Sequence, residues 1–553
     1  MTNLRFPLST GFLIATTLVL QTAFRTQARA AEDAKTAVIV DASQILAAND
    51  QFWSNLVLHP TEYLSTEWGE EHLALLRESG AARKYVRIYN QPEDAAYLRD
   101  DGSVGYRWDH FDRRADLILK EGLKPSVAFF SMPAQIAADP SLLRKRPFLD
   151  GKPIYIGAPK DYRLWQEVCA DFTRHVIERY GEKEAATWRF SCWNEPDLGG
   201  FSRFKLEEYW SLYDHFAAGV RSVSTRIPIG GPSLSSGNIY KNPHLFRNTL
   251  EHIARGKNCA TGETGSPIDF ITVHTYGGHG AAGSSQSKYP SVDYLLEQQL
   301  RLVKIRDEFP ELRRVPIVVA EWGVTSGGGT GMDRRPLAEV RNSQYAPAFL
   351  ATAVARLIDL KLNHDVRIGD MYLCLSGYEV ARQRDFEGKR TAATRSGFDK
   401  PLLNGYRMLA RLGKELVSSR VDPADGPVSV VAARDDRRQV AVLVAHFRND
   451  HPDNLGPGAT VELEIDTPWP AGTSVTLHHW RVDETHSNAY TVFRDLGRPE
   501  QPSAEEIVQI KARMGLEPLE NPRQLRIDGP VQMQIELPCN ALSLVELVVE
   551  GEE

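Results

Sequence analysis

Two glutamates stand at the ends of apolar, strand-like runs and have the chemistry of a catalytic pair. Glu195 lies in "WRFSCWNEPDLGG" and Glu321 lies in "VPIVVAEWG". Hydrolysis of a glycosidic bond needs one carboxyl group that protonates the leaving oxygen and a second, ionised one that attacks the sugar or activates water. Each motif alone is more often a loop or a half-buried ion pair, so the prediction depends on a fold that brings the two together.

The elements that would position this pair are eight short apolar runs between about residues 50 and 415. Most are rich in β-branched or aromatic residues, which is typical of buried parallel strands. The runs are "FWSNLVL", "KYVRIY", "KPSVAFF", "WRFSCW", "RIPIGG", "IDFITVHTY", "VPIVVAEW" and "MYLCLSG".

Amphipathic stretches with helical spacing lie between these runs. In "DYRLWQEVCADFTRHVIERYG" the apolar residues recur at helical intervals, and Gly181 stands where a helix commonly ends. Eight such β–α units predict a (β/α)8 TIM barrel over residues 46–415. The alternative is an open, doubly wound sheet, but no glycine-rich phosphate loop follows the first strand.

The chain beyond the barrel has a different pattern. Residues 416–553 read as antiparallel strands separated by turn clusters such as "DPADGP", which predicts a β-sandwich accessory domain. The run "TAVIVDAS" within residues 31–45 could add an N-terminal strand to it. Residues 1–30 resemble a signal peptide, with Arg5, the apolar run "FLIATTLVL" and a cleavage site at Ala28–Ala30. The sequence therefore predicts export, either to a periplasm or to the outside of the cell; the alternative is an uncleaved N-terminal anchor.

Composition narrows the possible ligands. The chain has 553 residues and a net charge of −7, which does not suggest binding of nucleic acid. Its five cysteines form no CxxC or Cys/His cluster, and no HExxH or EF-hand pattern occurs, so the sequence predicts neither a metal nor another cofactor. No stretch after the leader is long enough to span a membrane in the mature chain.

In a barrel, the residues at the carboxyl ends of the strands face the active site. The second predicted strand ends with Arg87 and Tyr89, the sixth with His274 and Tyr276, and the fourth and seventh with the two glutamates. Asn194 and Trp322 adjoin the glutamates. Pro196 donates no hydrogen bond and disfavours helical backbone at the residue before it, so we expect it to stop the strand there and to keep Glu195 out of the helical region.

These motifs resemble those of glycoside hydrolase family 39, which contains β-xylosidases and α-L-iduronidases within a large clan of retaining (β/α)8 glycosidases. The similarity runs from about Asp41 to Val549. It is carried by "FDRRADLILKEGLKPSVAFFSMP", "WRFSCWNEPDL", "IGGPS", "IDFITVHTYG", "VVAEWG", "FDKPLLNGYRMLARLG" and the tail "RVDETHSNAYTVFRDLGRPEQPSAEEI".

The resemblance implies a role for each candidate residue. Glu195 corresponds to the general acid/base and Glu321 to the nucleophile. Asn194 matches the residue that binds the sugar 2-hydroxyl, and Arg87 one that keeps the nucleophile ionised. The strand-six positions that face the sugar are His274 and Tyr276; Tyr89 and Trp322 are further candidates for substrate binding, although Trp322 could equally belong to the core.

Two departures from the family pattern leave the sugar open. Tyr89 stands where the family often has histidine, and Tyr276 stands where iduronidases carry a lysine suited to a uronate. The segment "TGETGSPIDFITVH", in contrast, is closer to the iduronidase branch. An exo-acting β-xylosidase-like enzyme is the leading hypothesis, with an iduronidase-like or other family glycosidase, an endo-acting glycanase and a catalytically silent carbohydrate-binding barrel as alternatives.

Under each of these hypotheses the substrate or ligand is an oligosaccharide or polysaccharide. The sequence motifs specify neither the glycosidic linkage nor the oligomeric state. The basic run "RKRP" at residues 144–147 could meet an anionic polysaccharide, although such runs more often form a solvated face.

Overall fold

The computed structural model describes residues 35–89, 96–101, 103–145, 153–235, 237, 241–279, 287–377 and 384–550. The predicted signal peptide lies outside these residues. None of the helices in the described part of the chain combines the length and the apolar character that a bilayer span requires.

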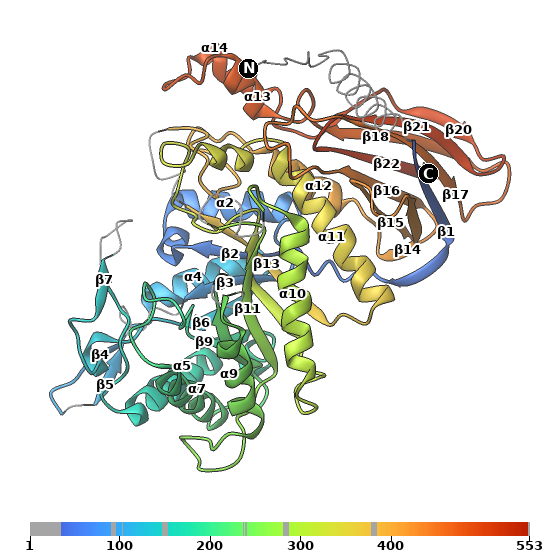
Figure 1. Ribbon diagram of the computed structural model, residues 1–553. Helices are drawn as coiled ribbons and strands as arrows, with labels where there is room; N and C mark the ends of the chain where they lie inside the picture. The colour runs from blue at the N-terminus through green and yellow to red at the C-terminus, as the bar shows by residue number, and fades with distance from the viewer. Residues whose placement is uncertain are drawn as a thin grey trace, which may run out of the picture.

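Eight parallel strands close into a barrel, which confirms the predicted (β/α)8 architecture (Figure 1). All eight apolar runs of the sequence form strands of this barrel. They are β2 (Asn55–His59), β3 (Tyr85–Tyr89), β6 (Lys124–Phe129), β9 (Arg189–Cys192), β10 (Ile229–Leu234), β11 (Phe270–Tyr276), β12 (Ile317–Gly323) and β13 (Ile368–Ser376). Their order around the barrel follows the chain, and β13 pairs with β2 to close it.

The barrel interior is filled by side chains in layers. Near the amino ends of the strands, a cluster of Tyr85, Phe270, Val318 and Tyr372 forms the floor. Above it lies a second buried group that includes Tyr276 and Cys374. Polar groups at the carboxyl ends of the strands therefore stand on a packed base rather than over a pore.

Helices surround the barrel and cover its outer face. They are α2 (Glu67–Glu78), α4 (Asp109–Lys120), α5 (Tyr162–Tyr180), α7 (Leu206–Arg221), α9 (Pro243–Arg255), α10 (Val292–Asp307), α11 (Tyr345–Asn363) and α12 (Pro401–Ala410), with the short α6 (Glu182–Ala185). In α5, the Asp161 side chain caps the first turn and Gly181 ends the helix with a φ of 81°, which glycine adopts without steric cost. Two small hairpins, β4–β5 (Ala96–Leu98, Val104–Tyr106) and β7–β8 (Leu143–Lys145, Pro153–Tyr155), occupy the loops that follow β3 and β6.

The C-terminal region forms one ten-stranded sheet around its own apolar core. The N-terminal strand β1 (Thr36–Ala48) belongs to this sheet, antiparallel to β14 and parallel to β17. The other strands are β14 (Glu415–Asp422), β15 (Val428–Asp435), β16 (Gln439–His446), β17 (Ala459–Asp466), β18 (Ser474–Val482), β19 (Glu517–Pro518), β20 (Arg523–Arg526), β21 (Val531–Leu537) and β22 (Ala541–Val549).

The two regions meet along α11 and α12, which contact β15, β16, β18 and β22. A second contact comes from α13 (Ala489–Asp495) and α14 (Ala504–Lys511), which Figure 1 shows at the top of the molecule. Tyr490 and Phe493 of α13 and Ile510 of α14 pack with Phe386 and Phe398 in a separate buried cluster. Phe386 and Phe398 belong to the loop after β13, so the C-terminal region supports a loop of the barrel.

Candidate active site

The backbone around Glu195 turns sharply as it leaves the barrel wall. β9 ends at Cys192, and Trp193 and Glu195 have φ values of 67° and 46°. Glu195 therefore lies outside the right-handed helical region, in the left-handed one. Its amide donates to the carbonyl of Ser233 at 3.0 Å, which holds this conformation in place. Such backbone costs roughly 1–3 kcal/mol and is concentrated at functional sites.

The strand ends bring Glu195 and Glu321 to one place. In β11 and β12, His274 is the register partner of Glu321. Nδ1 of His274 lies 3.0 Å from Oε1 of Glu195 and 3.6 Å from Oε2 of Glu321. One polar atom from each of the three side chains lies within 4.8 Å of the others. This separation fits the ~5–5.5 Å between the carboxyl groups of retaining glycosidases and is smaller than the ~6.5–9.5 Å of inverting ones.

Arg87 holds Glu321 and Asn194 at the same time. Its Nη1 donates to Oε1 of Glu321 at 3.1 Å and its Nη2 donates to Oδ1 of Asn194 at 3.0 Å. The hydroxyl of Tyr89 donates to the same amide oxygen at 3.3 Å. With that oxygen engaged by two donors, the side-chain nitrogen of Asn194 remains a donor for a ligand.

A second set of contacts reaches the other oxygen of Glu321. The hydroxyl of Tyr276 donates to Oε2 at 2.7 Å, and Nη1 of Arg390 donates to the Tyr276 oxygen, also at 2.7 Å. Arg390 lies in the loop after β13, and sequence reasoning missed it. The only signal in the sequence was the polar, cationic character of that loop, which does not single out one arginine.

These contacts determine the charge state of Glu321. Burial alone would raise the pKa of its carboxyl group. The positive charges of His274, Arg87 and Arg390, together with the hydrogen bond from Tyr276, outweigh burial and hold the pKa of Glu321 well below its usual range. Burial raises the pKa of Tyr276 well above its ordinary value, so its phenol stays protonated and can donate. The site thus contains an ionised carboxylate at neutral pH.

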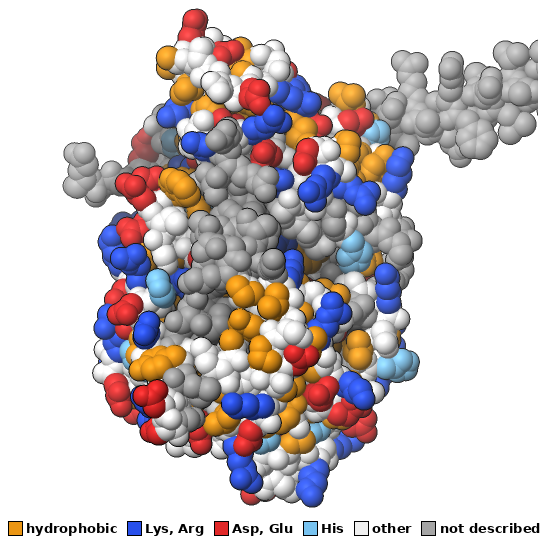
Figure 2. All heavy atoms as spheres, turned by 90° about the vertical axis from the view of Figure 1, so that its left-hand side faces the viewer, with side chains coloured by type: hydrophobic (Ala, Val, Ile, Leu, Met, Phe, Trp, Pro, Cys, Tyr) orange, Lys and Arg blue, Asp and Glu red, His pale blue; other side chains and the backbone are white. Residues whose placement is uncertain are grey.

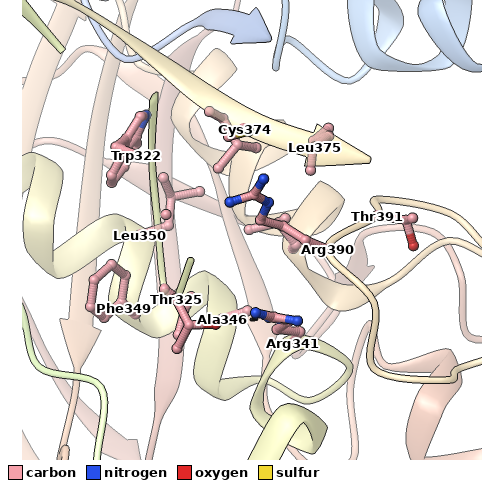
Figure 3. Close-up of a pocket in the computed structure, with 14 residues that line it drawn as sticks. Trp322, Thr325, Arg341, Ala346, Phe349, Leu350, Cys374, Leu375, Arg390 and Thr391 are labelled. Atoms are coloured by element: carbon pink, nitrogen blue, oxygen red, sulfur yellow. Dashed lines mark hydrogen bonds between the residues drawn. The ribbon is translucent and has the colours of Figure 1, made fainter. Parts of the chain in front are cut away.

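The structure does not bring Trp322 into this group. Because neighbouring side chains of a strand point to opposite faces, the inward position of Glu321 turns Trp322 outward. Trp322 is fully buried in the main core. Figure 3 shows it in a pocket between the barrel wall and α11, on the opposite side from Arg390. The hypothesis that Trp322 stacks on the sugar is therefore corrected to a packing role, whereas the other predicted residues converge.

Comparison with known proteins gives a consistent result. The model of the family "Glycosyl hydrolases family 39" matches residues 36–532. A β-xylosidase of Caldicellulosiruptor saccharolyticus is 23% identical over 481 residues, which are 86% of this chain and 90% of that protein. The human α-L-iduronidase is 24% identical over 485 residues, 82% of this chain and 68% of that protein.

Among solved structures, the fold resembles a monomeric β-xylosidase from Caulobacter crescentus CB15, with a TM-score of 0.77 and 21% identity over 94% of this chain and 100% of the other. A bacterial orthologue of human α-L-iduronidase gives a TM-score of 0.75 at 20% identity, over 94% and 84% of the two chains. At these identities the likeness to solved structures shows the fold alone.

Proposed function

From the premise that this chain belongs to glycosyl hydrolase family 39 and is a retaining glycoside hydrolase, we propose that Glu321 is its nucleophile and Glu195 its general acid and base. The observation that carries the assignment is the approach of one oxygen from each carboxylate to within 4.8 Å, with His274 between them. The low pKa of Glu321 supports its role, because a nucleophile must be ionised before substrate arrives.

The first step forms a glycosyl-enzyme. An oxygen of Glu321 attacks the anomeric carbon as the bond from that carbon to the leaving oxygen breaks. The proton of Glu195 passes to the leaving oxygen, so the aglycone departs as a neutral alcohol. Arg87 and Tyr276 hold the two oxygens of Glu321 in place, which limits the motion needed for the attack.

The second step releases the sugar. Glu195, now ionised, takes a proton from water as the water oxygen attacks the anomeric carbon from the side that the aglycone left. The bond to Glu321 breaks and its carboxylate is restored, so the configuration at the anomeric carbon is retained. The side-chain nitrogen of Asn194, whose amide oxygen accepts from Arg87 and Tyr89, is the donor proposed for the sugar 2-hydroxyl, a contact that strengthens in the transition state.

For the sugar, we propose an exo-acting, β-xylosidase-like specificity. The named β-xylosidase relatives support it, as do the tyrosines at positions 89 and 276, which carry no positive charge for a substrate carboxylate. One observation favours an iduronidase-like specificity as the second candidate. Arg390 is a half-buried cation within hydrogen-bonding distance of Tyr276, so it offers the positive charge that a uronate requires and that Tyr276 lacks.

We also propose that the protein is exported, on the strength of the leader-like pattern in residues 1–30. N-terminal sequencing of the protein recovered from its source tests this: a mature terminus near Ala31 supports cleavage, and an intact Met1 contradicts it.

The enzyme assignment is tested on a panel of aryl glycosides that includes β-xylosides and α-L-iduronides. Glu321→Gln should abolish turnover of every substrate that the wild-type protein cleaves. Glu195→Ala should lose about 10²–10⁴-fold on substrates with poor leaving groups and much less on activated aryl glycosides, which need no proton. Azide should rescue the Glu195→Ala variant and yield a glycosyl azide of retained configuration.

Two results would contradict the proposal. Unchanged turnover in Glu321→Gln would show that Glu321 is not the nucleophile. A product of inverted configuration would exclude double displacement. If the wild-type protein cleaved nothing in the panel but bound oligosaccharides, the catalytically silent barrel would be the better description.

A further inference from the structure

Arg341 is a buried arginine that lies between the two loops next to the nucleophile. It is the last residue of the short 3-10 helix η3 (Pro336–Arg341) and is 5% exposed. One of the loops follows β12, the strand of Glu321, and the other follows β13 and contains Arg390. In Figure 3, Arg341 lies next to Thr325 of the first loop and below Arg390 of the second. Its position therefore allows it to connect the two loops.

The guanidinium group of Arg341 donates hydrogen bonds to both loops. In the loop after β12, Nε donates to the hydroxyl oxygen of Thr325 at 2.8 Å and Nη1 to the carbonyl of Thr330 at 2.9 Å. Nη2 donates to the carbonyl of Ser326 in the same loop. In the loop after β13, the carbonyl of Gly388 accepts from Nη1 at 3.2 Å. Because the planar group presents its donors in a fixed arrangement, one side chain sets the distance between the loops.

The two loops also contact each other directly at this place. The amide of Met332 donates to the carbonyl of Glu387 at 2.8 Å, and the amide of Arg390 donates to the carbonyl of Gly328 at 3.3 Å. Gly328 lies against the side chain of Arg390 as well: a Cβ atom placed on it would be 3.0 Å from Nη2 of Arg390 and 3.1 Å from Nε. The loop after β12 therefore forms one wall of the space that the Arg390 side chain occupies.

Arg390 is the residue through which these loops reach the nucleophile. Its Nη1 donates to the hydroxyl of Tyr276, which donates to Oε2 of Glu321, and both distances are 2.7 Å. A displacement of Nη1 by about 1 Å would take the first contact outside hydrogen-bonding distance. Displacements of that size outside the reacting groups can slow a reaction by up to about a hundredfold.

We propose that Arg341 is a positioning residue for the nucleophile: by binding both loops, it holds Arg390 against Tyr276 and so keeps the hydrogen bond from Tyr276 to Glu321 in place. This role rests on the proposed function, in which Glu321 attacks the sugar. The contacts of the Arg341 guanidinium group described above are with loop atoms, so its effect on the reaction passes through Arg390.

Arg306 provides a matched control at the other end of the same two strands. It is 1% exposed, and its Nη1 donates to the carbonyls of Val315 at 3.2 Å and Arg367 at 3.1 Å. Val315 precedes β12 and Arg367 precedes β13. Arg306 thus connects the segments that enter these strands, whereas Arg341 connects the loops that leave them. Removal of either arginine should lower the melting temperature, but only removal of Arg341 should displace Arg390.

Hydrogen–deuterium exchange followed by mass spectrometry tests the connection between the loops without a substrate. In R341A, peptides within residues 324–335 and 384–400 should exchange about fivefold faster or more, because the contacts that close these loops are lost. In R306A the same peptides should exchange at the wild-type rate. Wild-type exchange within residues 384–400 of R341A would overturn the proposal, whatever the activity of the variant.

Covalent labelling tests the effect on the nucleophile. A 2-deoxy-2-fluoro glycoside with a good leaving group, made for the sugar that the wild-type protein cleaves, should accumulate as a glycosyl-enzyme on Glu321. We expect the labelling rate constant to fall about five- to tenfold in R341A and by a similar factor in R390A. R341A/R390A should be slower than R390A by less than about twofold, because both substitutions remove the same contact. R341K should recover part of the rate, since lysine retains the charge with fewer donors.

The pH dependence of labelling separates this role from a general loss of stability. The contacts of Arg390 and Tyr276 lower the pKa of Glu321, so their weakening in R341A raises that pKa and leaves more of the carboxyl group protonated in acid. The acidic limb should therefore move to higher pH by about 0.5–1 unit. The groups that face Glu321 from other elements stay in place, namely Arg87 and Tyr89 of β3, Glu195 after β9, His274 of β11 and Cys374 of β13.

Surface charge does not account for such a shift. On the face shown in Figure 2, Lys and Arg side chains are interspersed with Asp and Glu side chains wherever the residues are described, so this face presents no field of one sign. Arg384 belongs to the same loop as Arg390, and its side chain is 66% exposed. R384A removes a positive charge from this loop and should leave the acidic limb at the wild-type pH, because exposed charges are screened.

Gly328→Ala displaces Arg390 from the other loop and keeps Arg341, which makes it the decisive variant if R341A does not fold. Its methyl group would lie 3.0 Å from Nη2 of Arg390, closer than ordinary van der Waals contact. Arg390 must then move by a few tenths of an ångström. Labelling should slow about two- to fivefold, with the acidic limb again at higher pH.

Three results would overturn the role of Arg341 and leave the proposed hydrolysis intact. The first is a wild-type rate of labelling in R341A, and the second is an equal loss in R306A. The third is a full multiplication of the two single losses in R341A/R390A, which would show that Arg341 acts independently of Arg390. Failure of the wild-type protein to form any adduct on Glu321 would contradict the proposed function itself.

Discussion

Arg390 donates a hydrogen bond of 2.7 Å to the hydroxyl of Tyr276, although the two residues are 114 positions apart in the sequence. The same hydroxyl donates to Glu321. The Tyr276 hydroxyl therefore accepts a hydrogen bond from Arg390 and donates its own hydrogen to Glu321. Arg390 polarises the neutral hydroxyl of Tyr276, which strengthens the hydrogen bond from Tyr276 to Glu321. That hydrogen bond favours the ionised form of the Glu321 carboxyl group.

Tyr276→Phe should move the acidic limb of the kcat/KM profile to higher pH. The hydrogen bond from Tyr276 is one of the contacts that lower the pKa of Glu321, so its removal lets that pKa rise toward the ordinary value. A hydrogen bond to a charged group contributes about 1.5–3 kcal/mol and one pKa unit corresponds to about 1.4 kcal/mol, so the shift should be roughly one to two pH units. Tyr372→Phe, on the barrel floor, is the matched control and should leave the limb in place. A limb that moves to lower pH would contradict the direction of the contact.

Arg390 should discriminate between the two candidate sugars. Arg390→Ala removes a cation that lies against Tyr276, so we expect kcat/KM to fall about tenfold on a neutral xyloside through the weakened Tyr276 contact. On an α-L-iduronide the loss should reach about a hundredfold or more if the substrate carboxylate meets this cation. Steady-state kinetics on both substrates measure the difference, and Arg390→Lys should recover part of the iduronide rate. Equal losses on the two sugars would leave Arg390 as a positioning residue only.

Asn194→Asp should remove the side-chain N–H donor at this position and keep the oxygen that accepts hydrogen bonds. Oδ1 of Asn194 receives hydrogen bonds from Arg87 and Tyr89, and a carboxylate oxygen can accept both. The lost group is the side-chain nitrogen, the proposed partner of the sugar 2-hydroxyl. We expect kcat to fall at least tenfold on the normal substrate, and much less on a 2-deoxy substrate that never makes the contact. Equal losses on both substrates would indicate that the new negative charge, rather than the missing donor, is responsible.

Phe493→Ala, a substitution in the C-terminal region, should lower both the stability of the protein and the activity of the catalytic site. Phe493 is 4% exposed and lies 4.8 Å from Phe386 between ring centroids, so its removal leaves a cavity beneath the loop that carries Arg390. Buried phenylalanine-to-alanine changes cost about 3–5 kcal/mol, and we expect a lower melting temperature together with reduced kcat/KM. Val508→Ala on the neighbouring α14 removes a side chain that is 69% exposed and should change neither. Full activity in a destabilised Phe493→Ala protein would show that the cluster does not position the loop.

The barrel and most of the site could be predicted because they depend on local patterns. Each strand is a short run of β-formers, and the carboxyl ends of parallel strands must meet at one face, so Arg87, Asn194 and His274 follow from the strand assignments. Arg390 could not be predicted in this way, because tertiary packing against α13, and no local pattern, determines where its loop lies. The left-handed backbone of Glu195 was missed for a similar reason: the carbonyl of Ser233 on the next strand holds it.

For Trp322 the sequence leaves a sugar-stacking role and a core role open, although its side of the strand is predictable. Alternation along β12 places it opposite Glu321, against Phe349 and Leu350 of α11 in the pocket of Figure 3. Trp322→Phe should therefore lower the free energy of unfolding by about 1–3 kcal/mol through lost packing, while KM stays within about twofold of the wild type. Thermal unfolding and steady-state kinetics measure the two effects separately. The same substitution at a residue that stacks on the sugar would raise KM with little loss of stability, and that outcome would return Trp322 to the substrate-binding site.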